Sequence, residues 1–325
     1  MQERLLECLK IALEYHAGDL HFTLQDGQVR IEMRVGGKMR RLRSHPDDPA
    51  FFHYLMYRAN LDVSDVLTPQ TGRFEETVDG RTLSLRFAVV TSYHMTSGVL
   101  RLLNQMPQLM IHDLTPDKEQ QAWLGDVTRH RTGLFVFSGP TGSGKTTTLY
   151  TLLNETKDRK IFTLEDPVEV VSTRYVQLQI NEKQNLSWED GIRQLLRHDP
   201  DIVMIGEIRE KTAAVNAVRC ALSGHLVVTS LHAQSCAGAI RRLEDLGVSP
   251  MQLQEVLGGI TSQRLYDCGE GRKECVYEIM DRKEIAYWYE HGRHTDGYRG
   301  LVQEIREAVD AGRIPAVEAA GDLLE

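Results

Sequence analysis

The distribution of hydrophobic and polar positions changes character at about Trp123. Before this point, residues 1–15 read as an amphipathic surface helix and residues 49–61 as a second helix. Short strands with alternating or continuous apolar residues, separated by glycine-containing turns, are predicted at 21–25, 29–35 and 81–90. A helix followed by such strands predicts a small α+β domain.

From Trp123 onward, short apolar runs typical of buried strands alternate with helical segments. The runs are LFVFSG at 134–139, KIFTLED at 160–166, DIVMIGE at 201–207 and HLVVTSLH at 225–232. This alternation predicts the α/β class, with a parallel sheet and helices on both faces. The preceding segment, QMPQLMIHDLTPDKE, carries two prolines and polar residues, and we interpret it as an interdomain linker.

Composition narrows the class of partner. The chain has 325 residues, enough for two domains, and its 41% hydrophobic and 26% charged residues are typical of a soluble globular protein. A net charge of −8 argues against nucleic acid as the main partner, because phosphate contacts need a surplus of Lys and Arg. Arg40, Arg41 and Arg43 form one small basic group, for which a solvated strand end or turn is the alternative interpretation.

The sequence also bears on the cell compartment. No segment approaches the roughly 20 apolar residues of a membrane-spanning helix, and the first residues lack the apolar core of a signal peptide. The five cysteines are scattered without framework spacing, which predicts free thiols in a reducing cytosol. We therefore expect a cytoplasmic protein without a transmembrane segment, associated with the membrane only peripherally.

Residues 139–146 satisfy the phosphate-loop pattern G-x-x-x-x-G-K-[ST]. They are Gly139, Pro140, Thr141, Gly142, Ser143, Gly144, Lys145 and Thr146, and Thr147 follows at the start of a predicted helix. The glycines let the backbone wrap around phosphate, Lys145 is predicted to bridge the β- and γ-phosphates, and Thr146 to ligate Mg²⁺. A chance glycine-rich turn is the alternative, but the strand before the loop and the helix after it favour a nucleotide site.

Carboxylates end two of the predicted strands. Glu207 closes the run at 201–207, and Glu165 and Asp166 close the run at 160–166. Ligands of parallel sheets bind at the carboxyl ends of the strands, so these groups are candidates for orienting water and for holding a hydrated metal. A solvated strand-end carboxylate is the alternative for each one taken alone. Beside a phosphate loop we favour the functional interpretation.

His225 and His232 flank the run at 225–232. Seven residues apart on a strand, they point to opposite faces, so we do not expect a shared metal site. One of them is a candidate sensor of the γ-phosphate, and the other is then a satisfied buried histidine. Spacing alone does not decide between them.

With these motifs the sequence resembles the secretion ATPase superfamily of type II secretion and type IV pilus motors. GPTGSGKTTTLY resembles the Walker A box of that family, TLEDPVE its Asp box and SGHLVVTSLHA its His box. IVMIGEIR resembles its atypical Walker B box, in which Gly206 takes the usual Asp position and Glu207 carries the role. The match is continuous from about Leu134 to Arg242.

The N-terminal part resembles the family more weakly, through AGDLHF and through QTGRF, LSLRF and GVLRLL, which each carry an arginine. By position, Arg73, Arg86 and Arg101 are implied to reach the phosphates of the nucleotide across a domain or subunit interface. There they would neutralise charge in a loose phosphoryl-transfer transition state. An ordinary strand-surface arginine is the alternative for each, and Arg86 ranks first among the three.

Two features bear on the subfamily. Many assembly ATPases carry two C-x-x-C pairs, whereas this region has only Cys268 and Cys275, so we predict no zinc because a Cys₄ site needs four thiolates. The first residues already resemble the second N-terminal domain of the family, without the larger extra domain of many assembly motors. This short build most resembles the competence motor of Gram-positive bacteria, the ATPase that builds the DNA-uptake pseudopilus.

The resemblance implies a RecA-like P-loop ATPase domain with a smaller N-terminal α+β domain. The predicted boundaries are a PAS-like N-terminal domain at 1–105, a linker at 106–122, a RecA-like ATPase core at 123–265 and a helical C-terminal extension at 266–325. Six copies would form a homo-hexamer with ATP and Mg²⁺ between the two domains and an adjacent subunit. The ring would act on a polytopic inner-membrane platform protein, from the cytoplasmic face of the membrane.

Within this scheme each candidate residue has a role. Glu207 and Glu165 are expected to handle water and metal. Lys145 and Thr146 bind phosphate and Mg²⁺. His232, followed by His225, couples the phosphate site to conformation.

Three alternatives stay open at the level of sequence. A nucleic-acid translocase of the RecA class is opposed by the acidic net charge. A pilus retraction ATPase would use the same boxes, although the QLQIN segment and the competence-like build favour assembly. A non-catalytic scaffold is opposed by Glu165 and Glu207. Sequence does not separate competence from secretion or adhesion pili, nor give the ring symmetry, the turnover rate or the role of the C-terminal extension.

Overall fold

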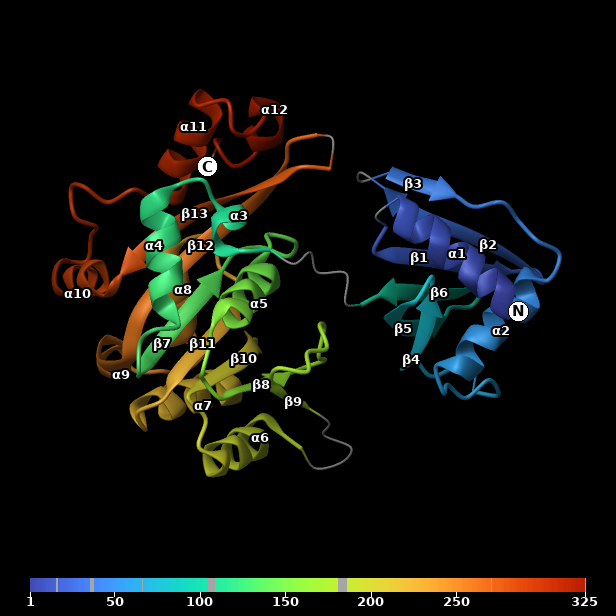
Figure 1. The fold of residues 1–325 in the computed structure, drawn as a ribbon, viewed down its shortest axis with the longest axis horizontal. Coiled ribbons are helices and arrows are strands. Elements are labelled where there is room, and N and C mark those ends of the chain that lie inside the picture. The colour runs from blue at the N-terminus through green and yellow to red at the C-terminus, as the bar shows by residue number, and fades with distance from the viewer. Residues whose placement is uncertain are drawn as a thin grey trace. The chain divides into compact units, whose positions relative to one another are not determined.

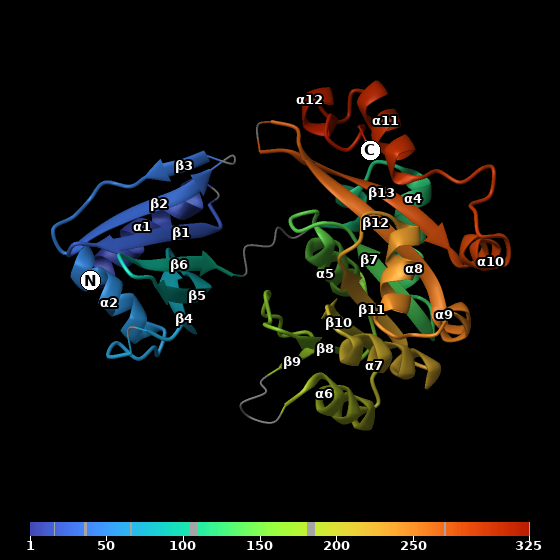
Figure 2. The same cartoon turned by 180° about the vertical axis from the view of Figure 1, so that it is seen from behind.

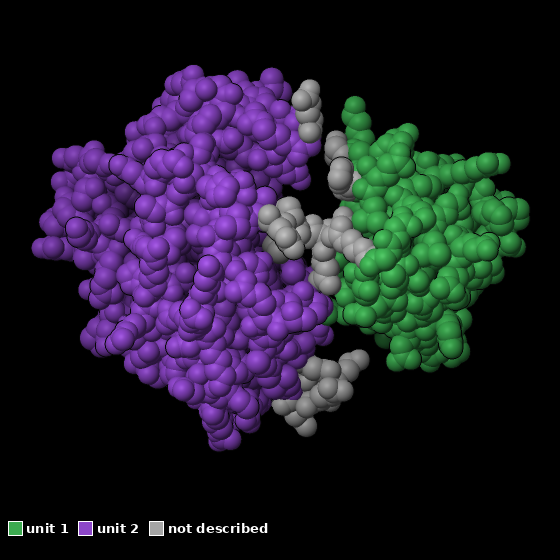
Figure 3. Space-filling model, in the orientation of Figure 1, with its two compact units in different colours: residues 1–105 green, residues 106–325 purple. Residues whose placement is uncertain are grey.

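The computed structural model describes residues 1–15, 17–35, 38–65, 67–103, 109–180, 186–269 and 271–324. The chain forms two compact units, Met1–Gln105 and Met106–Glu325, which Figure 3 shows in different colours. None of the helices in these ranges has the length and apolar character needed to span a bilayer.

In its described residues, the N-terminal unit forms a six-stranded antiparallel sheet with two helices. Its strands, in spatial order, are β3 (Lys38–Arg41), β2 (Gln28–Val35), β1 (Asp19–Gln25), β6 (Thr96–Leu102), β5 (Arg81–Thr91) and β4 (Gln70–Val78). The helices α1 (Gln2–Glu14) and α2 (Asp48–Arg58) pack with the sheet in one core, where Phe22 and Phe87 meet edge to face. The predicted α+β domain is therefore present. Arg40 and Arg41 lie on the exposed edge strand β3.

The C-terminal unit is built on a seven-stranded sheet. In spatial order its strands are β13 (Lys273–Asp281), β12 (Leu257–Asp267), β7 (Gly133–Ser138), β11 (Leu226–Leu231), β10 (Ile202–Ile208), β8 (Ile161–Glu165) and β9 (Val176–Gln179). Neighbouring strands run parallel except β12 and β13, which form an antiparallel hairpin. The predicted parallel sheet is confirmed.

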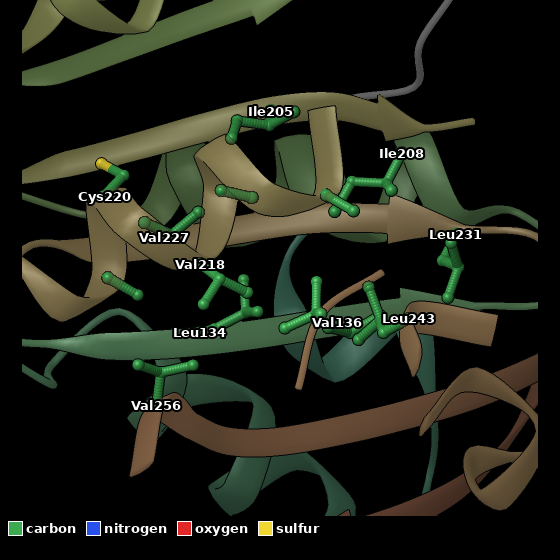
Figure 4. Packing of buried hydrophobic residues seen from close by; sticks show 14 of the residues in the cluster. Leu134, Val136, Ile205, Ile208, Val218, Cys220, Val227, Leu231, Leu243 and Val256 are labelled. Carbon is green, nitrogen blue, oxygen red and sulfur yellow. The ribbon is translucent and has the colours of Figure 1, made fainter. Parts of the chain in front are cut away.

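Helices cover both faces of this sheet (Figures 1 and 2). On one face lie α4 (Lys118–Val127) and α5 (Lys145–Glu155), and on the other α6 (Trp188–Leu195), α7 (Lys211–Leu222), α8 (Cys236–Asp245), α9 (Pro250–Val256) and α10 (Arg282–His291). The inner strand β7 contributes to both cores because its side chains alternate. Leu134 and Val136 pack with α7, α8 and α9 (Figure 4), whereas Phe135 and Phe137 pack with α4 and α5.

The structure corrects two expected boundaries. The sequence predicts a helical segment at 266–325, but this segment begins with β13, whose predominantly buried residues pair with β12. Only then do α11 (Leu301–Asp310) and α12 (Ala316–Ala319) follow. In the predicted linker, α3 (Ile111–Leu114) and the start of α4 are helical, while residues 106–108 lie outside the described residues. The second proline does not mark an extended segment, because it precedes Asp117, whose side chain caps α4.

Glu304 of α11 is a buried carboxyl group that should make stability depend on pH. Burial raises its pKa from 4.5 to about 7, although the charge of Arg299 acts in the opposite direction. The carboxyl group has its ordinary pKa of 4.5 in the unfolded chain. As pH rises from 4.5 toward 7, the unfolded chain therefore releases the proton before the folded chain does, which favours unfolding. Between about pH 5 and pH 8 the free energy of unfolding should therefore fall by about 1–2 kcal/mol relative to a Glu304→Gln variant, after allowance for solvent screening.

Urea denaturation at each pH measures this difference. Glu307→Gln is the matched control, because Glu307 lies on the same helix, also contacts Arg299 and is more exposed. Parallel stability curves for the parent protein and Glu304→Gln would contradict the prediction.

Candidate nucleotide-binding site

The loop between β7 and α5 has the backbone that phosphate binding requires. Gly139, Gly142 and Gly144 adopt φ angles of 144°, 81° and 87°, which side chains rarely permit. A Cβ atom at Gly139 would lie 2.6 Å from both the main-chain oxygen of Gln263 and Ser143 Oγ, so only glycine fits there. A loop of this kind, followed by the N-terminus of a helix, presents N–H groups to an anion.

Lys145, the first residue of α5, is held against the loop. Its Nζ donates to the main-chain oxygens of Gly139 and Pro140, at 2.8 and 2.9 Å. Burial lowers the pKa of this amine, and the negative charges of Glu207 and Glu169 oppose that effect. The ammonium group of Lys145 is therefore placed where it can donate to the phosphate oxygens of a nucleotide bound in the loop.

The remaining loop residues fit a phosphate group. Thr141 and Gly142 are exposed, Thr146 and Thr147 are half-buried in the first turn of α5, and Ser143 is buried. Within the described part of the chain, Ser143 Oγ has no hydrogen-bond partner. A glycine-lined loop that carries a buried, unpaired hydroxyl matches the needs of a nucleotide phosphate.

Strand β12 contacts the phosphate loop through Gln263, a contact that was not predicted from the sequence. The fully buried Gln263 donates through Nε2 to the main-chain oxygen of Ser143 at 2.7 Å. Beside it, Thr148 Oγ1 lies 2.8 Å from the hydroxyl of the buried Tyr277 on β13. The run TSQR at 261–264 is polar in sequence and did not indicate a buried strand, so Gln263 left no clear signal, although a buried amide needs partners.

Glu207 lies at the carboxyl end of β10, at the same edge of the sheet as the phosphate loop. Its Oε2 accepts from Arg209 Nε at 2.8 Å, and its Oε1 lies 2.8 Å from Nε2 of His232, which directly follows β11. The charges of Asp166 and Glu169 also act on Arg209. The structure thus brings Glu207, His232 and Asp166, predicted from three separate motifs, to one edge of the sheet.

Glu165 differs from Glu207 in being deeply buried at the end of β8. The hydroxyl of Tyr150 donates to the carboxylate of Glu165 and lies 2.8 Å from both of its oxygens. Thr163 Oγ1 donates to Oε1 of the same carboxylate at 2.6 Å. Gln177 Nε2 adds a longer contact of 3.3 Å. Burial raises the pKa of Glu165, while these donors oppose the shift. No sequence pattern indicated the tyrosine, which comes from the helix after the phosphate loop.

Replacing Tyr150 by Phe should lower the free energy of unfolding by about 1–3 kcal/mol, because a buried carboxylate loses its strongest donor. Urea denaturation measures the change. Tyr57→Phe, which removes an exposed hydroxyl from α2, is the control and should be neutral. Equal stability of Tyr150→Phe and the parent protein would show that Glu165 does not depend on this hydroxyl.

Comparison with known proteins identifies the family. The model of the type II/IV secretion system protein family matches residues 1–313. The chain belongs to this family. The resemblance found in the sequence motifs is therefore confirmed, and the chain is a P-loop ATPase of the secretion type.

Two relatives illustrate the range of the family. The competence protein ComGA of Bacillus subtilis is 32% identical over 321 residues, which cover 91% of this chain and 90% of the relative. The type II secretion system protein E of Pseudomonas aeruginosa is 36% identical over 259 residues, which cover 78% of this chain. The alignment spans only 52% of the second relative, about half of its length.

Two solved structures of ATPases are similar in fold. The pilus retraction motor PilT, solved with bound ADP, matches with a TM-score of 0.73 and 26% identity, over 97% of this chain and 95% of PilT. The ATPase DotB of Yersinia pseudotuberculosis matches with a TM-score of 0.77 at 20% identity, over 100% of this chain and 94% of that one. Both comparisons support the predicted P-loop ATPase fold.

The two histidines of the family's His box lie at opposite edges of the sheet. His225 precedes β11 beside Gly133, whose N–H donates to its main-chain oxygen, whereas His232 follows β11 on the side of the phosphate loop. Six strand residues separate them by about 20 Å. This corrects the prediction of His225 as a cofactor-binding residue for the loop of its own chain. A strand between two histidines places them at opposite ends as well as on different faces.

The three family arginines of the N-terminal unit form a row. Arg73 of β4 is in register with Arg86 of β5, which is in register with Arg101 of β6. Directly opposed residues on neighbouring strands share one face of the sheet. Asp19 of β1 continues the row and receives two hydrogen bonds from Arg101, at 2.7 and 3.0 Å. The sequence motifs did not reveal this alignment.

The two cysteines at the position of the family's zinc motif lie in different environments. Cys275 is buried, with its Sγ near Gln263 and in the core that contains α5. Cys268 packs against the separate apolar cluster of α11 and α12. Among the described residues, no group of three or more potential metal ligands comes together.

Proposed function

We propose that this chain is a Mg²⁺-dependent, ATP-hydrolysing motor that works as a hexamer and powers assembly of a type IV pilus-like pseudopilus. The observation that carries the proposal is the edge of the sheet where the phosphate loop, Glu207 and His232 meet. Family membership and the coverage of the competence protein ComGA favour this role over a general nucleotide-binding one.

The chain's own residues divide the chemistry between them. The loop at 139–146 binds the phosphates through main-chain N–H groups, and Lys145 adds positive charge. Glu207, held by Arg209 and adjacent to His232, orients the attacking water and accepts its proton. Mg²⁺, when bound, neutralises phosphate charge, and the Thr146 hydroxyl would hold it. Glu165 and Asp166 would hold the water molecules around that metal, and Tyr150 holds Glu165 in place.

The arginine row supplies the second half of the site in this proposal. Arg86 at its centre, with Arg73 and Arg101 on either side, would meet the phosphates of a nucleotide held by an adjacent subunit. Arginines that neutralise a phosphoryl-transfer transition state contribute about 10³–10⁵ in rate in other systems. Nucleotide turnover then opens and closes the ring, which transmits force to a platform protein in the inner membrane. The motor would work in the cytoplasm, at the cytoplasmic face of that membrane.

Mixing two inactive variants tests the proposal. Arg86→Ala keeps Glu207, and Glu207→Gln keeps Arg86, so mixed rings would contain some interfaces with both residues intact. We expect ATP turnover to reappear on mixing, up to about a quarter of the parent rate if subunits exchange at random and the active sites act independently. Each variant mixed with itself is the control. If the subunits are shown to have exchanged and ATP turnover still does not recover, the arginine is not supplied by a neighbouring subunit.

Pilus retraction is the second candidate, favoured by the similarity to PilT. The two roles predict opposite phenotypes when the gene is deleted from its host. Loss of an assembly motor removes surface filaments, whereas loss of a retraction motor leaves them in excess. Direct action on nucleic acid is not part of the proposal, since the net charge is −8.

A further inference from the structure

Arg264 of β12 is a buried arginine that joins three separate segments. Its side chain is 8% exposed, and Nε donates to Asp322 Oδ1 at 2.9 Å. Nη2 donates to Gln234 Oε1 at 2.6 Å, and Nη1 to the main-chain oxygen of Gln263 at 3.2 Å. Tyr266 completes the cluster by donating to Asp322 Oδ2 at 2.8 Å. The guanidinium is thus surrounded by acceptors from β12, from the loop after β11 and from the C-terminal segment 316–324.

One of these contacts, the one with the main-chain oxygen of Gln263, leads directly to the nucleotide site. The oxygen of Gln263 that accepts from Arg264 is one of the two atoms that leave no room for a Cβ at Gly139, the first residue of the phosphate loop. The amide of the same glutamine holds Ser143 of that loop. The positive charge of Arg264 also acts on Lys145. One main-chain carbonyl therefore separates the guanidinium from the phosphate loop.

A second contact, with Gln234, leads to the edge of the sheet that carries Glu207 and His232. Gln234 is two residues beyond His232, which lies 2.8 Å from Glu207. Arg264 holds this turn through both the side-chain and the main-chain oxygen of Gln234. A shift of the guanidinium would move the loop that positions His232.

Asp322 determines how the guanidinium is held. It supplies the carboxylate paired with Arg264 and lies beyond residues 1–313, which the family model matches. A buried arginine that loses its carboxylate partner is costly and must reorient. The C-terminal segment is therefore mechanically connected to the phosphate loop and to the turn after His232.

We propose that Arg264 is a positioning residue that couples the C-terminal segment 316–324 to the nucleotide site, with Asp322 as the side chain that sets its orientation. The proposal rests on the proposed ATPase function, which it deepens with a regulatory connection. Anything that displaces the C-terminal segment, such as a partner protein bound there, would lower turnover. A purely structural ion pair between Arg264 and Asp322 is the alternative.

Turnover by Asp322→Asn distinguishes these two possibilities. The substitution keeps the shape of the side chain and removes its charge. We expect kcat to fall about tenfold, within the range by which coupling residues change a distant site, while the Kd of ATP changes less than about threefold. Glu318→Gln, the same change of charge at an exposed position of α12, is the control and should be neutral. Unchanged kcat with a lowered Tm would overturn the proposal.

Non-additivity gives a second readout. Asp322→Asn and Gln234→Ala should lower kcat by less together than the product of their single effects, because both act through Arg264. Arg264→Lys should restore only part of the coupling, since lysine does not reproduce the planar fork of donors. Independent effects that multiply would contradict a shared route through the guanidinium.

Hydrogen exchange tests the coupling without turnover, and so separates its failure from that of the ATPase proposal. Coupling between two sites is reciprocal. Binding of a non-hydrolysable ATP analogue to the parent protein should therefore change exchange in residues 316–324, and this response should be lost in Asp322→Asn. If the analogue binds and leaves that segment unaffected, the coupling is absent even where hydrolysis is intact.

Discussion

Glu207→Gln should lower ATP turnover by about 10²–10⁴-fold while nucleotide binding is retained, because the loss of a general base removes a contribution of this size. Glutamine keeps the shape of the side chain, but it loses the charge paired with Arg209 and one of the two acceptor oxygens. It cannot accept a proton from the attacking water. The Kd of ATP should change little, because the phosphate loop and Lys145 are left in place.

Single-turnover hydrolysis and equilibrium nucleotide binding, measured on the same preparation, separate these effects. The matched control is Glu210→Gln, an exposed residue three positions further along the chain without a side-chain cap contact. It should behave as the parent protein does. Turnover unaffected by Glu207→Gln would remove Glu207 from the catalytic site and shift attention to Glu165.

Gly139→Ala should have the second large effect, on both folding and nucleotide binding. The alanine Cβ would meet a buried main-chain oxygen and Ser143 Oγ at 2.6 Å, in a backbone with a φ of 144°. Neither obstacle is the end of a long, flexible side chain. We expect the free energy of unfolding to fall by about 3 kcal/mol, combining overpacking with backbone strain, and ATP affinity to be lost.

Gly224→Ala is the control that measures the cost of backbone strain without a steric clash. Gly224 has a φ of 93°, a Cβ atom added there would meet nothing within 4 Å, and the residue belongs to the edge of the sheet away from the phosphate loop. Its substitution should cost about 1 kcal/mol and leave binding unchanged. If both variants bind ATP equally well, the steric argument for Gly139 is wrong.

Motifs with strong local geometry could be predicted from sequence. The phosphate loop was predictable because three glycines, a lysine and a following helix have few other uses together. The placement of Glu207 and Glu165 at the ends of two strands was predictable because the carboxyl ends of parallel strands meet at one edge of the sheet. The α/β class followed from the alternation of short apolar runs with helices.

Features that depend on tertiary contacts were not predictable. Strand β13 pairs with β12 as an antiparallel hairpin at the edge of the sheet, and no turn signal stronger than Gly269 and Gly271 marks it. Tyr150 reaches Glu165 only because α5 packs over β8. By contrast, His225 precedes its strand and so lies at the edge away from the phosphate loop. This followed from the predicted parallel sheet, and the prediction for His225 did not take it into account.

The arginine row and the Arg264 cluster show the same limit. Each arginine is an ordinary strand residue by sequence, and only the register of neighbouring strands aligns Arg73, Arg86 and Arg101. Arg264 is separated from Asp322 by more than fifty residues, so their ion pair leaves no local signal. Contacts of this kind require the folded structure.

The most direct test of a ring motor with shared active sites is the specific ATPase activity of the purified chain across protein concentration, with and without DNA. Activity per subunit that rises with concentration, in step with the formation of hexamers measured by light scattering, and that is unchanged by DNA is the predicted result. Activity per subunit that stays constant while the protein is monomeric would contradict sites completed by a neighbouring subunit, and strong stimulation by DNA would indicate a translocase.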